Sequence, residues 1–223
     1  MTWLTDTLAW LSDGGNWSGP DGAGGLLLQH VWLSAVSLVL AAVLVVPLGL
    51  WLGHTGRGGA IALNTGNVGR AVPTLAVLVL LALAPPPFGK GDLSIVTALV
   101  LFAVPPVLTN TYVGVREVDR SAVDAARGMG MSGWQVLRGV ELPLAAPMIV
   151  QGLRLAGVQI IATATIAALA GGGGLGQLIT DGFNRQDQPQ LIAGAVLVAA
   201  LALAVEGVFE VAQRAVRPPS ARG

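Results

Sequence analysis

Long runs of apolar residues recur along this chain and limit the folds that it can adopt. The first extends from Leu26 to Leu52, and a helix needs about 20 such residues to cross the hydrocarbon core of a bilayer. Similar runs cover residues 71–84, extended backwards by the more polar residues 64–70, and residues 93–115, 146–170 and 191–211. Because lipid offers no hydrogen bonds, each spanning segment must satisfy its own backbone groups. The sequence therefore predicts an all-α membrane protein with about five transmembrane helices.

The composition agrees with a membrane protein and removes several other classes. Hydrophobic residues make up 53% of the 223 residues and charged residues only 11%, against about a quarter in soluble domains. The formal net charge is zero, which gives no reason to expect nucleic acid as a partner. Cysteine is absent, and His30 and His54 are far apart in the sequence. Each histidine is expected to be an interfacial or loop residue rather than a metal ligand.

The longest polar interruption is the stretch from Asp119 to Pro147. Its alanines favour a first short helix, Gly128 and Gly130 break that helix, and a second helical turn is expected over residues 134–138. Prolines then precede the next apolar run. Two short helices joined by a glycine turn between two spans are typical of a docking surface for a soluble partner. A plain solvated loop is the alternative.

The distribution of basic residues predicts the orientation of the chain in the membrane. The side that holds the polar stretch carries nine arginines, whereas the opposite side carries only Lys90 and Arg185; the nine are Arg57, Arg70, Arg116, Arg120, Arg127, Arg138, Arg214, Arg217 and Arg222. Basic loops stay in the cytoplasm, so the N-terminus is expected outside and the C-terminus inside.

This orientation divides the chain into three parts. Residues 1–24 are expected to be extracytoplasmic, and Trp3, Leu4, Leu8 and Leu11 could share one face of an interfacial helix; a frayed tail is the alternative. Residues 25–215 form the transmembrane domain, with the polar loop at 117–147, and residues 216–223 form a cytoplasmic tail.

Two glycine-containing segments look like nucleotide-binding motifs but lack their context. Gly171, Gly173 and Gly176 satisfy GxGxxG, but a membrane helix precedes them where a dinucleotide fold requires a strand. The segment around Lys90 lacks the upstream glycine and the following Ser or Thr of a phosphate-binding loop. No catalytic constellation is evident either. We therefore expect no ATP hydrolysis, no enzymatic activity, and no cofactor or metal bound by this chain.

Two charged residues fall inside predicted spans. Arg154 lies 8 residues into the fourth span and Glu206 lies 8 residues before Arg214, so each is roughly 12 Å inside its helix. A charge at that depth is costly unless it is paired or hydrated. We expect Arg154 and Glu206 to face each other or a shared polar cavity; separate snorkelling to the interface is the alternative.

Further polar residues in the spans are candidates for lining a solute pathway. Gln159 and Thr163 are four positions apart and so share a helix face, and Asn110 follows the two prolines of the third span. Hydrogen bonding between helices is the alternative role for each of these residues.

The polar loop resembles the cytoplasmic "EAA" loop of binding-protein-dependent ABC importer permeases. The matching residues are Asp124, Ala125, Ala126, Gly130, Val140, Leu142 and Pro143, at the family's spacing throughout. Asp124 stands where the family usually has Glu, which keeps the charge and shortens the side chain. The resemblance implies the MetI-like permease fold of type I ABC importers. It also implies that these residues, together with Gly128, couple the permease to its ATPase.

The loop from Asp124 and three further stretches, which begin at Val72, Phe102 and Ala164, resemble the osmoprotectant branch of that family, which transports glycine betaine, choline and carnitine. This resemblance implies a prokaryotic cytoplasmic membrane, a second permease subunit, a cytoplasmic ATPase dimer that holds ATP and magnesium, and an extracytoplasmic substrate-binding protein. The chain has one tyrosine, Tyr112, so no aromatic cage for a quaternary ammonium group is evident. A permease for another small zwitterion or amino acid is one alternative. A channel or membrane enzyme without an ATPase is another.

Overall fold

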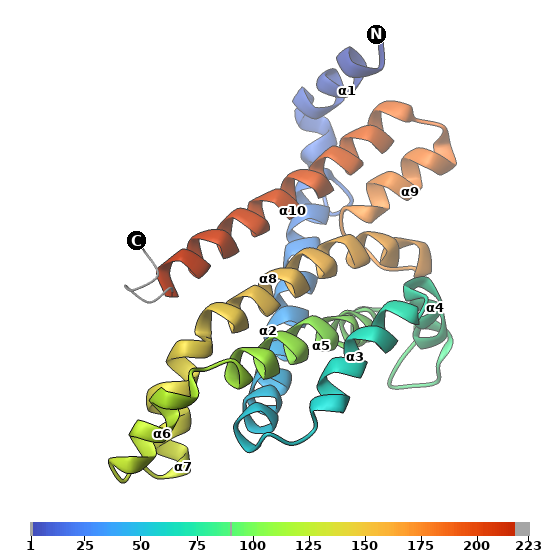
Figure 1. Ribbon diagram of the computed structural model, residues 1–223. Helices are drawn as coiled ribbons and strands as arrows, with labels where there is room; N and C mark the ends of the chain where they lie inside the picture. The colour runs from blue at the N-terminus through green and yellow to red at the C-terminus, as the bar shows by residue number, and fades with distance from the viewer. Residues whose placement is uncertain (1, 90, 217–223) are drawn as a thin grey trace.

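The computed structural model describes residues 2–89 and 91–216, and these form helices joined by short connections (Figure 1). Lys90 and most of the expected tail at 216–223 lie outside the described residues. The helices are α1 (Thr2–Ser12), α2 (Ala23–Thr55), α3 (Gly59–Ala71), α4 (Thr74–Leu83), α5 (Asp92–Arg116), α6 (Arg120–Gly128), α7 (Gly133–Val136), α8 (Leu142–Ala167), α9 (Gly176–Arg185) and α10 (Gln188–Val216), with 3-10 turns at Gly14–Trp17 and Ala168–Ala170 and a π-helical segment at Leu137–Glu141.

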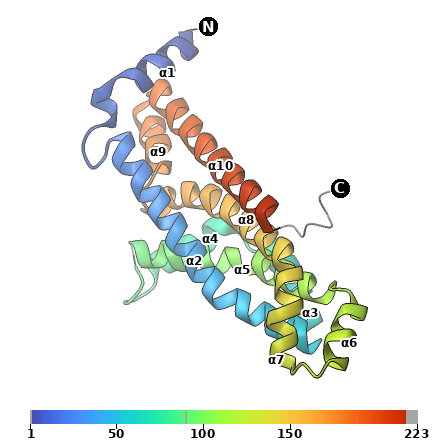
Figure 2. The same ribbon diagram turned by 90° about the vertical axis from the view of Figure 1, so that its left-hand side faces the viewer.

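Among the described residues, four helical segments are long and apolar enough to cross a membrane: Ala23–Thr55, Asp92–Arg116, Gly133–Ala170 and Gln188–Val216. In both views α6 and α7 lie at the end of the molecule opposite α1 and α9 (Figures 1 and 2). The predicted all-helical membrane architecture is confirmed. Its polar loop therefore projects from one end of the bundle.

The second predicted span is broken into two helices. One helix was expected over residues 71–84 with its extension over 64–70, but α3 ends at Ala71 and α4 begins at Thr74. Pro73 lacks an N–H group and forces the residue before it out of the helical region, and Val72 accordingly has φ −81° and ψ 123°. With 13 and 10 residues, each helix is shorter than a full crossing requires.

The fourth span also begins earlier than predicted. The helical turn expected over residues 134–138 is the first part of a continuous helical segment that runs from Gly133 to Ala170. Pro143 lies in the first turn of α8, directly after the π-helical segment Leu137–Glu141. A proline inside a helix removes one backbone hydrogen bond and crowds the preceding turn, and the wider π-helical backbone stands at this point of the continuous segment. The polar loop is therefore joined to a membrane helix without an intervening flexible segment.

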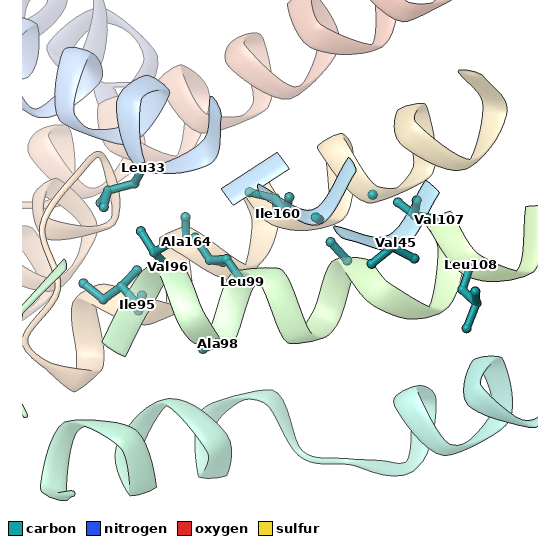
Figure 3. Close-up of a cluster of buried hydrophobic side chains, with 14 of the residues drawn as sticks. Leu33, Val45, Ile95, Val96, Ala98, Leu99, Val107, Leu108, Ile160 and Ala164 are labelled. Carbon is teal, nitrogen blue, oxygen red and sulfur yellow. The ribbon is translucent and has the colours of Figure 1, made fainter. Parts of the chain in front are cut away.

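The core of the bundle lies between α2, α5 and α8. Figure 3 shows Val96 and Leu99 of α5 pointing toward Ala164 of α8, and all three are buried. Small residues let these helices approach closely: a Cβ on Gly49 would lie 2.7 Å from the Cβ of Thr111. The three helices thus form the tightly packed unit that carries the polar loop.

Candidate functional site

Helix α6 packs one face against the bundle and leaves the other free. Val123 and Ala126 are 1% and 2% exposed, and they belong to a hairpin-end cluster, as we call the buried residues Val115, Val118, Val123, Ala126, Val136, Ala145 and Ile149. Asp124, Ala125 and Arg127 are exposed on α6. The helix therefore offers a polar surface while its other side is fixed to the ends of α5 and α8.

A side chain caps the beginning of α6. Asp119 accepts hydrogen bonds from the backbone N–H of Ser121 at 2.9 Å and from the Ser121 hydroxyl at 2.9 Å. These two hydrogen bonds, the backbone one first, hold the pKa of the Asp119 carboxyl below its ordinary value. The cap satisfies an amide that has no partner within the helix, so α6 has a defined start.

A glycine closes the other end of α6. Gly130 has φ +85°, its N–H donates to the Arg127 carbonyl at 2.9 Å, and the N–H of Met131 donates to the Ala126 carbonyl at 3.2 Å. This pair of hydrogen bonds is the Schellman motif, in which glycine is favoured at the left-handed position. The four-residue spacing from Ala126 to Gly130 is therefore a consequence of how this helix ends.

The next helical segment starts immediately afterwards with a capping box. The Ser132 hydroxyl accepts from the Gln135 N–H at 3.4 Å, and the Gln135 side chain accepts from the Ser132 N–H at 2.7 Å. Both helices of the loop thus have fixed termini, and the loop is a rigid hairpin. We call residues 119–141 the coupling hairpin. The alternative of a plain solvated loop is not what the structure contains.

The residues predicted to contact an ATPase fall into two groups. Asp124, Ala125, Gly128, Gly130 and Pro143 are exposed, whereas Ala126 is buried and Val140 and Leu142 are half-buried against the hairpin-end cluster. The first group forms the exposed surface of this region. The second group holds the coupling hairpin on the bundle.

Two large side chains of the coupling hairpin are exposed and were not among the residues predicted to contact a partner. Met129 is 77% exposed and Trp134 is 63% exposed, and the guanidinium carbon of Arg138 lies 5.0 Å from the centre of the Trp134 ring. Exposed Trp and Met residues at a loop tip outside a membrane are typical of a protein contact. Their exposure could not be read from the sequence because apolar residues of a short helix also build cores.

A hydrogen bond joins the coupling hairpin to α2. His54 Nδ1 lies 2.5 Å from Glu141 Oε2, and the Glu141 side chain is 3% exposed. The partners are 87 positions apart, so their proximity in space was not visible in the sequence. Glu141 was not among the predicted residues.

His30 is not the interfacial or loop residue that was expected. It is 0% exposed, its Nδ1 accepts from the Leu175 N–H at 3.2 Å, and its Nε2 lies 3.2 Å from the Ile161 carbonyl. Since Nδ1 accepts, Nε2 carries the proton and donates to Ile161. His30 thus ties α2 to α8 and to the glycine-rich loop at residues 171–174. The glycines of this loop form a packed turn, in which a Cβ on Gly173 would lie 2.2 Å from Gln29.

The two charged residues inside the spans lie against each other. Arg154 Nη2 donates a hydrogen bond to Glu206 Oε1, and Arg154 Nη1 donates to Gln213 Oε1 at 3.1 Å. Gln213 in turn donates to the Pro147 carbonyl at 3.4 Å. This network connects α8 with α10, which is otherwise the most weakly buried of the four long segments.

The three residues proposed for a solute pathway have different surroundings. Asn110 is half-buried and donates to the Pro106 carbonyl at 2.8 Å, Gln159 is exposed and Thr163 is 5% exposed. Their exposure to solvent therefore differs from one residue to the next. Among the described residues, no three His, Asp or Glu side chains are grouped so that they could hold a metal ion.

Comparisons with known proteins agree with this geometry. A family model described as "Binding-protein-dependent transport system inner membrane component" matches residues 45–218. The glycine betaine/carnitine/choline transport system permease protein OpuCB of Bacillus subtilis is 36% identical over 195 residues, with 87% of this chain and 88% of that protein covered. The osmoprotectant import permease protein OsmW of Salmonella typhimurium is 36% identical over 208 residues, with 88% and 93% covered.

Solved structures provide the same architecture. The MetNI methionine ABC transporter, in an inward-facing conformation, aligns with a TM-score of 0.75 at 22% identity, covering 86% of this chain and 94% of that chain. This likeness concerns the fold, and it confirms the predicted MetI-like architecture.

Proposed function

Because the chain belongs to the family of binding-protein-dependent transport system inner membrane components, we propose that it is the permease subunit of an ATP-driven importer of quaternary ammonium osmoprotectants. The relatives that support the substrate class carry glycine betaine, carnitine, choline or osmoprotectant in their names. The chain itself forms the membrane passage. ATP and magnesium are bound and used on a separate cytoplasmic ATPase dimer.

The coupling role is supported by the position of α6, which packs one face against the bundle and leaves the other exposed. Val123 and Ala126 fix the helix to the bundle while Asp124 and Ala125 remain free at one end of the molecule. A helix with capped ends moves as a rigid body when a partner displaces it, because its backbone hydrogen bonds are already satisfied. The free face of α6 therefore sits in a groove of the ATPase.

The hairpin-end cluster supports a path for the motion from the ATPase to the spans. It contains Val115 of α5 and Ala145 and Ile149 of α8, with Leu50 of α2 packed against it. When the ATPase dimer closes on ATP, α6 moves, and the packed helix ends move with it. The spans then rock between inward-facing and outward-facing states around a solute passage, and hydrolysis resets them.

The remaining partners follow from this role. A second permease subunit, identical or paralogous, completes the passage, and Gln159, which is exposed on α8, faces the solute or that subunit. Asn110 and Thr163 support the passage from within the helix packing. An extracytoplasmic binding protein delivers the solute to the side opposite the coupling hairpin, so the N-terminus lies outside and the C-terminus inside.

Reconstitution tests this proposal. The chain is co-purified with its ATPase and binding protein, placed in proteoliposomes, and supplied with labelled glycine betaine, choline or carnitine, with methionine and histidine as comparison solutes. ATP-dependent uptake of at least one quaternary ammonium solute is expected. Uptake of an amino acid alone would replace the substrate class, and solute flux without an ATPase would overturn the importer role.

A pair of variants tests the coupling surface in the same vesicles. Ala125→Trp places a large side chain on the free face of α6, whereas Ala215→Trp places the same side chain on the exposed end of α10. We expect only the first to abolish ATP-driven uptake. Equal loss in both variants would contradict the assignment of α6 as the ATPase contact.

A further inference from the structure

Glu141 is a buried carboxylate that the ATPase contact does not use. Its side chain is 3% exposed, whereas Asp124 of the same coupling hairpin is exposed. Burial of a carboxylate is unfavourable unless a partner compensates the lost hydration. Its partner is His54, whose Nδ1 donates to Glu141 Oε2 at 2.5 Å.

Glu141 ends a rare backbone element. Residues Leu137–Glu141 form a π-helical segment between α7 and α8, and single π-helical turns inside α-helices are frequently found at functional sites. The backbone is wider there than in α7 or α8, so this is where the continuous segment Gly133–Ala170 can bend most easily. A side-chain link at this position therefore holds the point at which the hairpin joins the membrane helix.

His54 lies between two parts of the coupling hairpin. Besides its hydrogen bond to Glu141, its ring faces the start of α7, where a Cβ on Gly133 would lie 3.2 Å from His54 Nε2. His54 belongs to the last turn of α2, which is a central helix of the core. One imidazole thus contacts both ends of the segment 133–141 and the cytoplasmic end of α2.

The chain connects the hairpin directly to α5 and α8, but not to α2. Residues 117–119 lead from α5 into the hairpin, and Glu141 leads into α8. On α2, Val46 and Leu50 contribute apolar contacts to the hairpin-end cluster, and such contacts are non-directional and can slide. A hydrogen bond depends on distance and angle, so His54–Glu141 is the contact that resists sliding.

We propose that His54 and Glu141 are positioning residues that transfer the displacement of the coupling hairpin to α2. The proposal rests on the proposed function, since the displacement is produced by the ATPase. With the pair intact, the end of α2 follows the hairpin, and the three core helices move together. Without it, the last turn of α2, which carries His54, no longer follows the hairpin at its junction with α8, and ATP is hydrolysed without complete opening of the passage.

The test measures solute imported per ATP hydrolysed by the complete complex in proteoliposomes. Glu141→Met removes the acceptor with a side chain of similar length, and we expect the ratio to fall about fivefold or more, as for loss of a typical coupling between sites. Glu141→Gln keeps an acceptor oxygen and is expected to restore most of the ratio. His54→Phe combined with Glu141→Met should be no worse than either single change.

Glu210→Met is the matched control. It breaks the Arg214–Glu210 pair, also 2.5 Å long, on the exposed surface of α10, and the ratio should stay at the native value. An unchanged ratio in Glu141→Met, or an equal fall in the Glu210→Met control, overturns the proposal. Absence of ATP-driven uptake in the native complex would instead refute the proposed function.

A distance measurement covers the case in which Glu141→Met does not assemble. The chain has no cysteine, so spin labels can be attached at Thr55→Cys, on the end of α2, and Arg120→Cys, on α6. In the otherwise native chain the label-to-label distance should stay the same between nucleotide-free and ATP-trapped complexes, because both ends move together. With His54→Phe added, the distance should change on trapping; identical behaviour with and without His54→Phe overturns the proposal.

Discussion

Gly130 provides a test of the coupling hairpin in which two neighbouring glycines should respond in opposite ways. Gly130 has φ +85° and no atom within 4 Å of the position where a Cβ would lie. Gly128 also has open space there, but it belongs to α6 and has no positive φ. Replacing each with alanine therefore separates the cost of backbone conformation from that of crowding.

The magnitude follows from the backbone alone. A non-glycine residue in the left-handed region costs about 1–2 kcal/mol, so Gly130→Ala should raise the open fraction of the turn by about 5- to 30-fold. Gly128→Ala should stabilise the end of α6 by up to about 1 kcal/mol, because alanine favours helix over glycine. Gly130→Asn should lie between native and Gly130→Ala, since asparagine tolerates this conformation.

Hydrogen exchange of the reconstituted complex measures these changes. The amide of Met131 donates across the turn to Ala126, and its exchange should accelerate in Gly130→Ala by the factor given above and slow or stay constant in Gly128→Ala. ATP-driven uptake should fall in the same order, with Gly130→Val lowest and its spans still inserted. Equal exchange rates in the two alanine variants would refute the role assigned to the Schellman turn.

Three further changes test other parts of the structure. The lowered pKa of Asp119 means that its cap stabilises α6 fully above the ordinary carboxyl pKa of about 3.9. This stabilisation is lost as the pH falls through the lowered pKa. The protection of the α6 amides from hydrogen exchange should therefore fall over this pH range in the native chain and not in Asp119→Asn. Gly174 has φ +82°, and a Cβ there would lie 2.9 Å from Nδ1 of the buried His30. Gly174→Ala should therefore lower the free energy of unfolding by about 2–3 kcal/mol. Gly19 also has a positive φ but lies in open space, so Gly19→Ala should cost only about 1–2 kcal/mol. Arg154→Met should lower the thermal unfolding temperature in detergent, and adding Glu206→Met should recover it, because the single change leaves a carboxylate without its partner.

Local features of the coupling hairpin could be predicted from the sequence because they depend on near neighbours. The alanines of α6 at positions 122, 125 and 126, the glycine four positions after Ala126, and the serine followed three positions later by Gln135 encode a helix, its end and the next helix start. The charged residues Arg154 and Glu206 were found for a similar reason, since each stands out against an apolar run of known depth. Such signals need no knowledge of the tertiary fold.

Features that depend on distant residues could not be predicted. Glu141 lies between the motif residues Val140 and Leu142 without being one of them, and its burial depends on His54 of another helix. The partners of His30 are 131 and 145 positions away. The break at Pro73 was misjudged because prolines inside membrane helices are often tolerated, as Pro105 and Pro106 are within α5; packing, rather than the residue type, decides between these outcomes.

Cysteine cross-linking tests most directly the claim that a cytoplasmic ATPase acts on the free face of α6. The native chain has no cysteine, so Ala125→Cys, exposed on α6, and Ser12→Cys, exposed at the end of α1, each provide a single thiol. In intact cells Ala125→Cys should react only with a membrane-permeant maleimide and should cross-link to the ATPase subunit, whereas Ser12→Cys should react with an impermeant reagent and form no such cross-link. Labelling of Ala125→Cys from outside, or its failure to cross-link to any ATPase in a complex that imports solute, would contradict the account.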